Sequence, residues 1–284
     1  MDPIYSGPKM EARSTSGGGQ LSPAIERLVE DPFFYGHRWV EVEDERGKRR
    51  EQVPLTREDL LDPQEGDYVS NHSWHGEITA MLATILRALF TSRGRQDIRV
   101  GDDLKMLWKD KTISRVAPDI CVIPNVQDTQ RGIPSFNEGK EGTKPIFVLE
   151  VTSDATEETD KGDKIRVYQK AEVSEYVILD REEWEKGKEG TGKEDKKLTL
   201  TGYRLHPETK RYRKIRPGKE GLFLETLDLH LSVGDDGRRL VLIDALTGER
   251  LRDLTEVTAA ASEAEAKLRE AEAEIERLKA LLKT

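Results

Sequence analysis

Two acidic residues beside apolar segments, and a lysine further along the chain, are of types that could carry out hydrolysis. Asp119 precedes the apolar run Ile120–Ile123, and Glu150 lies near the end of an apolar run that begins at Phe147. Carboxylate oxygens are hard ligands for Mg²⁺, which polarises a phosphate and lowers the pKa of an attacking water. Lys164 could offset the negative charge that develops in the transition state. These residues suit metal-assisted hydrolysis of a phosphodiester.

The spacing of Asp160, Lys164 and Tyr168 places all three on one face of a predicted helix, four residues apart. Lys164 could then point at the strand ends, with Tyr168 packing or hydrogen-bonding behind it. Alternatively, Asp160 and Lys164 form no more than an exposed ion pair on the helix surface. Two carboxylates buried close together repel each other, so a divalent cation is their natural counter-charge.

Two further polar residues lie at the start of an earlier predicted helix. Glu77 could be an additional metal ligand, and His75 could be a proton shuttle or a phosphate contact. Either could equally be a polar residue at a helix start. The candidate catalytic set is therefore Asp119, Glu150, Lys164, Glu77 and His75, with Asp119, Glu150 and Glu77 as metal ligands.

Hydrophobic periodicity predicts the elements that must position these residues. Apolar residues at spacings of three and four predict an amphipathic helix over about 73–91, and a second helix is expected near 160–172. The run 146–152 is apolar on both faces until Glu150, as in a central strand covered by helices. The expected strands are residues 38–42, 51–53, 98–100, 104–108, 120–123, 146–152, 176–179, 198–204, 212–215 and 222–224, followed by a hairpin of 240–244 and 248–251.

Composition narrows the class of protein. The chain has 284 residues and a formal net charge of −9, which argues against coating nucleic acid by bulk attraction but does not exclude a nuclease. Residues 204–219 are rich in lysine and arginine and are either a phosphate-facing segment or a solvated hairpin. No run is long enough to span a membrane, and the single Cys121 excludes an internal disulfide. We expect a soluble cytoplasmic protein.

The pattern divides the chain into three parts. Residues 1–20 are Gly/Ser-rich and read as a disordered tail, 21–252 as one α/β domain, and 253–284 as a helix with the heptad seam of a coiled coil. We expect this helix to form a homodimer or to bind a partner protein, although its alanine-rich stripe could instead lie along the parent domain. A dimer would place two single-strand-cutting sites on one assembly.

The segment from about residue 31 to 248 resembles the Uma family of restriction-endonuclease-like proteins, a branch of the PD-(D/E)XK nuclease superfamily. The matching residues are Pro118-Asp119-Ile120, Glu150-Val151-Thr152-Ser153, Asp160 with Lys164 and Tyr168, and the run from Glu175 to Asp180. The resemblance implies a mixed central sheet of roughly four or five strands flanked by helices, here with additional β-hairpins and the C-terminal coiled coil, and Mg²⁺ or Mn²⁺ as cofactor. The superfamily's usual lysine, two residues after the glutamate, is replaced by Thr152, and Lys164 on the helix takes its role.

Three functions are compatible with these residues. The first is a Mg²⁺-dependent DNA endonuclease, in a defence or mobile-element context. The alternative is a catalytically weak or inactive nuclease-fold adaptor that binds a partner through its C-terminal helix. Hydrolysis of RNA or small nucleotides would use the same residues as the first. The charged cluster favours an enzyme, because an adaptor does not need one.

Overall fold

The computed structural model describes residues 27–28, 30–44, 47–69, 73–183 and 196–281. The predicted tail at 1–20 and most of the predicted loop at 185–197 lie outside these residues.

A six-stranded mixed sheet forms the centre of the fold, in the order β11-β10-β9-β8-β6-β4. Within this sheet, only β8 and β9 pair in parallel. The crossover between them runs through a π-helical turn and a helix, because parallel neighbours need a long connection. The sheet has one strand more than the upper number expected, because β11 adds to the edge. Its strands are β4 (Arg99–Asp102), β6 (Ile120–Ile123), β8 (Phe147–Val151), β9 (Glu175–Glu183), β10 (Lys196–Leu205) and β11 (Tyr212–Lys214).

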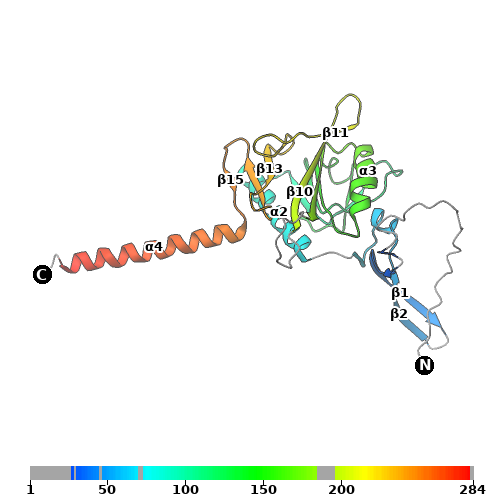
Figure 1. Ribbon diagram of the computed structural model, residues 1–284, viewed down its shortest axis with the longest axis horizontal. Helices are drawn as coiled ribbons and strands as arrows, with labels where there is room; N and C mark the ends of the chain where they lie inside the picture. The colour runs from blue at the N-terminus through cyan, green and yellow to red at the C-terminus, as the bar shows by residue number, and fades with distance from the viewer. Residues whose placement is uncertain (1–26, 29, 45–46, 70–72, 184–195, 282–284) are drawn as a thin grey trace, which may run out of the picture.

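Helices cover both faces of this sheet, as Figure 1 shows. On one face, α2 (Ser73–Ser92) packs with a small sheet over Phe147, Leu149 and Val151. On the other, α3 (Lys164–Lys170) packs over Val148. Every residue of β8 is buried, which confirms the expectation of a central strand covered on both sides, and β6 is buried throughout as well. The small sheet consists of β12 (Leu222–Leu224), β13 (Leu229–Val233), β14 (Leu240–Asp244) and β15 (Arg250–Leu251).

Shorter elements surround the core. The predicted strands near 38–42 and 51–53 are confirmed as a hairpin, and a third strand pairs beside it. The predictions from periodicity did not include β3, β7 and β13. The remaining elements are β1 (Gly36–Asp44), β2 (Gly47–Pro54), the short helix η1 (Asp59–Leu61), β3 (Asp67–Val69), and the parallel pair β5 (Lys105–Leu107) and β7 (Ser135–Asn137).

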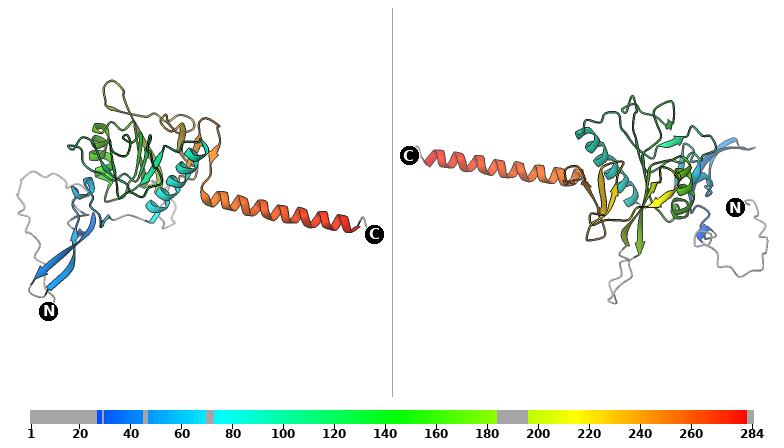
Figure 2. Two further views of the ribbon diagram at one scale, coloured as in Figure 1. Left: turned by 180° about the vertical axis from the view of Figure 1, so that it is seen from behind. Right: turned by 90° about the horizontal axis from the view of Figure 1, so that it is seen from above.

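The last helix, α4 (Leu254–Leu281), extends away from the rest of the molecule in all views (Figures 1 and 2). Asp253 and Glu256 start it with reciprocal bonds: Glu256 N–H donates to Asp253 Oδ1 at 2.8 Å, and Asp253 N–H donates to Glu256 Oε2 at 3.2 Å. The predicted C-terminal helix is thus confirmed, and the helix lies apart from the domain rather than along it. Among the described residues, no helix combines the length and apolar character needed to cross a bilayer.

Candidate active site

Three acidic residues lie in a row across adjacent strands of the central sheet. The antiparallel register of β6 and β8 sets Asp119 beside Glu150. Asp119 Oδ2 accepts a hydrogen bond from the Val151 N–H at 2.7 Å, which ties this carboxylate to the neighbouring strand. Asp103 follows β4, and its N–H donates to the backbone oxygen of Asp119 at 3.3 Å. Two strand-end acids that the sequence singled out are therefore brought together, with a third beside them.

Lys164 is buried between two carboxylates. Its Nζ lies 2.9 Å from Glu150 Oε2 and 2.8 Å from Asp160 Oδ1. The Lys164 side chain is 8% exposed and each of the two acidic side chains is 1% exposed, so the alternative of an exposed surface pair is wrong. The Tyr168 O–H donates to Glu150 Oε1 at 2.5 Å, so this tyrosine hydrogen-bonds behind the lysine. Position 152 is a buried threonine, and the ammonium group reaches Glu150 from the helix instead.

The segment that carries Lys164 is held rigidly over the sheet. It begins with the π-helical turn η2 (Thr159–Asp163), a type of helical irregularity that is frequent at functional sites. The Tyr176 O–H donates to the backbone oxygen of Asp160 at 2.9 Å, and Arg57 binds Asp163 at 2.7 Å from the N-terminal part of the chain. These contacts fix both ends of the turn, and with it the position of the lysine.

The first turn of α2 brings His75 to the site but not Glu77. His75 Nε2 lies 3.2 Å from Asp119 Oδ2, and its side chain is 12% exposed. Glu77 is exposed and does not line the cleft described below. Two residues along an α-helix correspond to about 200° of rotation, so neighbours at this spacing face opposite ways. The predicted role of Glu77 as a metal ligand therefore needs correction, whereas Thr79, four residues after His75, does face the cleft.

Burial and mutual repulsion control the ionisation of the acids. Burial raises the pKa of Glu150 well above its usual value, and the charges of Asp119 and Asp160 raise it further, against the opposing effect of Lys164. Burial likewise raises the pKa of Asp160, with Lys164 again opposing the shift. Burial would also raise the pKa of Asp119, but the hydrogen bond and charge of His75, together with Lys164, hold it below its usual value. Asp119 is thus the acid held most firmly as an anion.

The two basic groups respond to the same charges in the opposite sense. Burial would lower the pKa of Lys164, but Asp160, Glu150 and Asp119 together raise it above its usual value. Burial would also lower the pKa of His75, but its hydrogen bond to Asp119 and the neighbouring charges raise it. Both groups are therefore stabilised in their protonated forms by the carboxylates.

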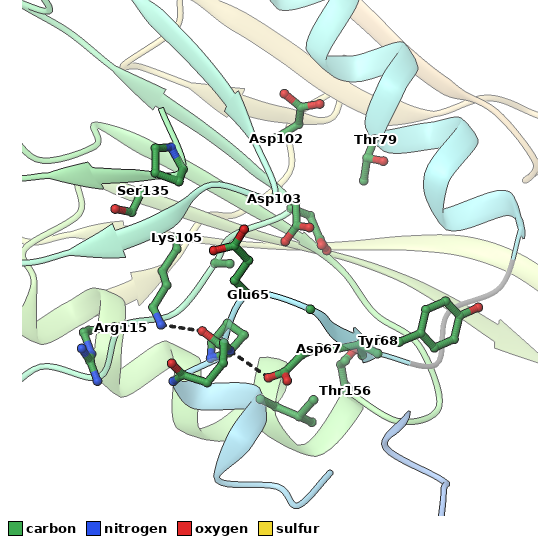
Figure 3. A pocket seen from close by; sticks show the side chains of 18 of the residues that line it. Glu65, Asp67, Tyr68, Thr79, Asp102, Asp103, Lys105, Arg115, Ser135 and Thr156 are labelled. Carbon is green, nitrogen blue, oxygen red and sulfur yellow. Dashed lines mark hydrogen bonds between the residues drawn. The ribbon is translucent and has the colours of Figure 1, made fainter. Parts of the chain in front are cut away.

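The cluster opens into a cleft of about 970 Å³, whose lining includes Asp119, Lys164, His75 and Asp103. Glu150 is buried behind Lys164 and contacts it directly. Figure 3 shows Asp103 in this pocket, with Lys105 among the residues around it.

Acidic groups outnumber cationic ones on the cleft wall. Asp103 and Asp119 are accompanied there by Glu65, Asp67 and Asp102, against the cations of Lys105, Arg115 and Lys164 and the histidine. Lys105 and Arg115 are paired with Asp62, and of the acids Asp67 is paired with Arg38 and Asp102 with Arg87. A phosphate bound beside Asp103 and Asp119 would meet their negative charge, so a cation at that position would favour its binding.

The donor set of the cluster fits a divalent cation in its chemistry. Within the described residues, no three Asp, Glu, His or Cys side chains already surround a metal-sized position. Asp119 and Glu150 nevertheless offer hard oxygen donors on adjacent strands. The buried Asp160 Oδ2 has no hydrogen-bond partner among the residues that the structure describes. Three carboxylates against Lys164 and His75 leave negative charge for a cation to balance.

The basic segment 204–219 does not face this site. Arg204 binds the buried Glu175 at 2.8 Å, and Glu175 begins β9, at the opposite end of the parallel strand pair from Glu150. Lys210 pairs with Glu172 at 3.2 Å. No residue of this segment lines the cleft, so the segment does not contact a phosphate bound at the cluster, and the two named side chains form ion pairs elsewhere in the fold.

Asp103 is a site residue that the sequence analysis missed. Its place beside Asp119 depends on the pairing of β4 with β6, which joins segments that are separated along the chain. Its backbone φ of 49° lies in the left-handed region, which aspartate tolerates better than most residues. Although Asp103 is exposed as a residue, desolvation of its carboxyl group within the cleft and the charge of Asp119 raise its pKa. The available signal was the Asp102-Asp103 pair directly after a short strand.

The mixed sheet, the acids on adjacent strands and the nearby lysine together define a protein of the restriction-endonuclease-like class. The family model of Uma2, described as "Putative restriction endonuclease", matches residues 66–234, more than half of the chain. The chain belongs to this family. It is also similar to a crystal structure described as a "putative nuclease belonging to DUF820" from Anabaena variabilis, with 16% identity and a TM-score of 0.38 over 61% of this chain and 87% of that one. No match is found among the curated proteins.

Proposed function

We propose that this chain is a metal-dependent endonuclease that hydrolyses phosphodiester bonds in DNA. The observation that carries the proposal is the buried Lys164 among Glu150, Asp160 and Asp119, open to the cleft on one side. Burying ionised groups costs several kcal/mol per ion, and replacing such a buried cluster by well-packed apolar residues is often neutral or stabilising, so a purely structural core does not require it. Strongly shifted pKa values in a cleft are characteristic of catalytic sites. Membership of the Uma2 family supports the same reaction class.

Asp119 and Glu150 would hold Mg²⁺ or Mn²⁺, which when bound supplies Lewis acidity and an activated water. Asp119 is suited to this role because His75 and Lys164 favour its ionised form. Lys164 holds its proton against burial, and its ammonium group can bind a phosphate oxygen and stabilise the charge that develops there. His75 fixes the orientation of Asp119 and carries a proton at Nε2 that it can donate.

The adaptor alternative has less support at this site. A platform for partner binding does not require carboxylates and a lysine buried together at strand ends. The projecting helix α4 does favour binding of another helix, but that property is compatible with an enzyme. Hydrolysis of RNA would use the same residues, so a cleavage experiment is needed to distinguish RNA from DNA as the substrate.

Cleavage of supercoiled plasmid by the full chain tests the proposal, with Mg²⁺, Mn²⁺ or EDTA in parallel reactions. We expect nicking with either metal and none with EDTA. Asp119→Asn and Glu150→Gln should slow cleavage by about a hundred-fold or more, the usual effect of removing an electrostatic contribution to the transition state. Glu77→Gln is the matched control, because the same change is made to an exposed acid on α2.

The controls distinguish chemistry from folding. Circular dichroism should show that each variant retains the wild-type fold. Parallel reactions with a single-stranded RNA show whether the protein cleaves RNA as well as DNA. Equal rates for Glu150→Gln and wild type would rule out the site. Absence of cleavage of DNA with both metals would reject the proposed activity.

A further inference from the structure

Helix α4 carries an apolar stripe that contacts nothing in the rest of the described chain over most of its length. Leu268, Ile275 and Leu278 are 59%, 51% and 50% exposed, and from Ala261 onward every described side chain of the helix is exposed. The stripe repeats at alternating spacings of three and four, which places its members at positions a and d of a heptad. These members are Leu254, Val257, Ala261, Ala264, Leu268, Ala271, Ile275 and Leu278.

The charged residues beside the stripe specify which helix fits it. With Leu254 at position a, Lys267 and Glu274 fall at position g, and Glu272 and Lys279 fall at position e. In a parallel, in-register pair, each g residue lies next to the e residue five positions later on the other helix. Lys267 then faces Glu272 of the second copy, and Glu274 faces Lys279 of the second copy. Both contacts join opposite charges, and the two-fold symmetry repeats each of them.

Antiparallel pairing lacks this complementarity. In that orientation, position g faces g and position e faces e. One of the two longest alignments pairs Glu265 with Glu272 of the second copy but also pairs Lys267 with Glu274, so its repulsive and attractive contacts cancel. The other pairs Lys267 with Lys267 and Glu265 with Glu265. Neither antiparallel alignment therefore has a net attraction between these groups, and one of them is repulsive, whereas the parallel register has attractive contacts and brings none of these groups against a like charge.

We propose that α4 binds α4 of a second copy of this chain as a parallel, in-register two-stranded coiled coil. The parallel orientation places both nuclease-like domains at the Leu254 end of the assembly. The ion pairs that these side chains make within α4, such as Lys267 with Glu263 at 2.6 Å, are exposed and exchange at little cost.

Cysteine cross-linking of the full chain tests both the partner and the orientation. The sole native cysteine, Cys121, is fully buried and does not interfere. Ala264→Cys places a thiol at position d, opposite its own counterpart only in a parallel, in-register pair. We expect mild oxidation to give a disulfide-linked dimer of this variant. Ala266→Cys, at the outward position f of the same helix, is the control and should remain uncross-linked.

Charge reversal tests the assigned contacts. Glu272→Lys sets lysine against Lys267, and we expect it to weaken the dimer by about ten-fold or more, since two attractive contacts become repulsive. Adding Lys267→Glu to that variant should restore the affinity. Glu270→Lys makes the same change of charge at position c, away from the seam, and should leave the dimer unchanged.

Light scattering and sedimentation of the full chain give the association constants. A monomeric wild type at high micromolar concentration would overturn the proposal, as would equal cross-linking at positions 264 and 266. A dimer that is insensitive to Glu272→Lys, or that is not rescued by the second change, would refute the parallel register.

Discussion

Replacement of Lys164 by methionine should destabilise the protein through the charges that remain. Methionine keeps the length of the side chain but removes the ammonium group that lies 2.9 Å from Glu150 and 2.8 Å from Asp160. Both carboxylates are buried, so water cannot take the place of the lost cation. The cluster then contains Asp119, Glu150 and Asp160 with only His75 to balance them.

The size of the effect follows from the distances. At an effective dielectric constant of about 20, each carboxylate attracts the ammonium group by about 6 kcal/mol. Desolvation of the lysine offsets several kcal/mol of this attraction, and removal of one partner from a buried ion pair typically costs about 3–5 kcal/mol. We expect Lys164→Met to lower the free energy of unfolding by that amount at neutral pH. Lys48→Met removes an exposed pair, that of Lys48 with Glu41, and should cost about 1 kcal/mol or less.

The loss should depend on pH with a definite sign. The pKa values of Glu150 and Asp160 are raised in the folded protein, and removal of Lys164 raises them further. A folded state that binds more protons than the unfolded state gains stability as pH falls. The deficit of Lys164→Met relative to wild type should therefore shrink as the pH is lowered from neutral into the range where these acids protonate.

Urea unfolding in EDTA, followed by circular dichroism from about pH 8 down to about pH 5, measures this effect for wild type and both lysine variants. A deficit of less than about 1 kcal/mol at neutral pH, no larger than expected for an exposed pair, would refute the description of a buried charge cluster. A deficit that grows on acidification would show that the remaining carboxylates are not its cause.

Three other substitutions have definite expected outcomes. Arg204→Ala leaves the buried Glu175 without its cation and should lower the free energy of unfolding by about 2–4 kcal/mol in urea titrations, without a direct effect on the cleft. Gly101→Ala places a Cβ 2.8 Å from Cys121 Sγ in the packed sheet, and the same titration should show a loss of about 1–3 kcal/mol. Glu77→Gln should cleave plasmid at the wild-type rate, because this exposed side chain does not line the cleft; a hundred-fold loss would restore it to the site.

The local sequence pattern was sufficient to predict the positions of those site residues that lie on strongly periodic helices and strands. The apolar runs beside Asp119 and Glu150 were correctly predicted as strands, the second of them as a central strand, and helical spacing correctly aligned Lys164 with Asp160 and Tyr168. These assignments depend on residues near one another in sequence or on strands long enough to be recognised.

Two features of the fold account for the site residues that were missed or wrongly assigned: pairing between strands far apart in the sequence, and the direction in which each residue points around a helix. Asp103 reaches Asp119 only because β4 pairs with β6, and no local signal determines that pairing. The error over Glu77 was of a different kind, because the apolar stripe of α2 alone predicts which side of the helix faces the domain. Its buried residues Leu82, Leu86 and Leu89 lie on the side of the helix that carries His75, and Glu77 is about 200° from His75 around the axis.

Binding of Mn²⁺ to the full chain tests the proposed metal site most directly. Electron paramagnetic resonance measures the free ion during titration of wild type, Asp119→Asn, Glu150→Gln and Glu77→Gln. We predict that wild type and Glu77→Gln bind Mn²⁺ equally and that the other two variants lose this binding. Undiminished binding by Glu150→Gln and Asp119→Asn, or no binding by wild type, would contradict the assignment of these strand-end carboxylates as a metal site.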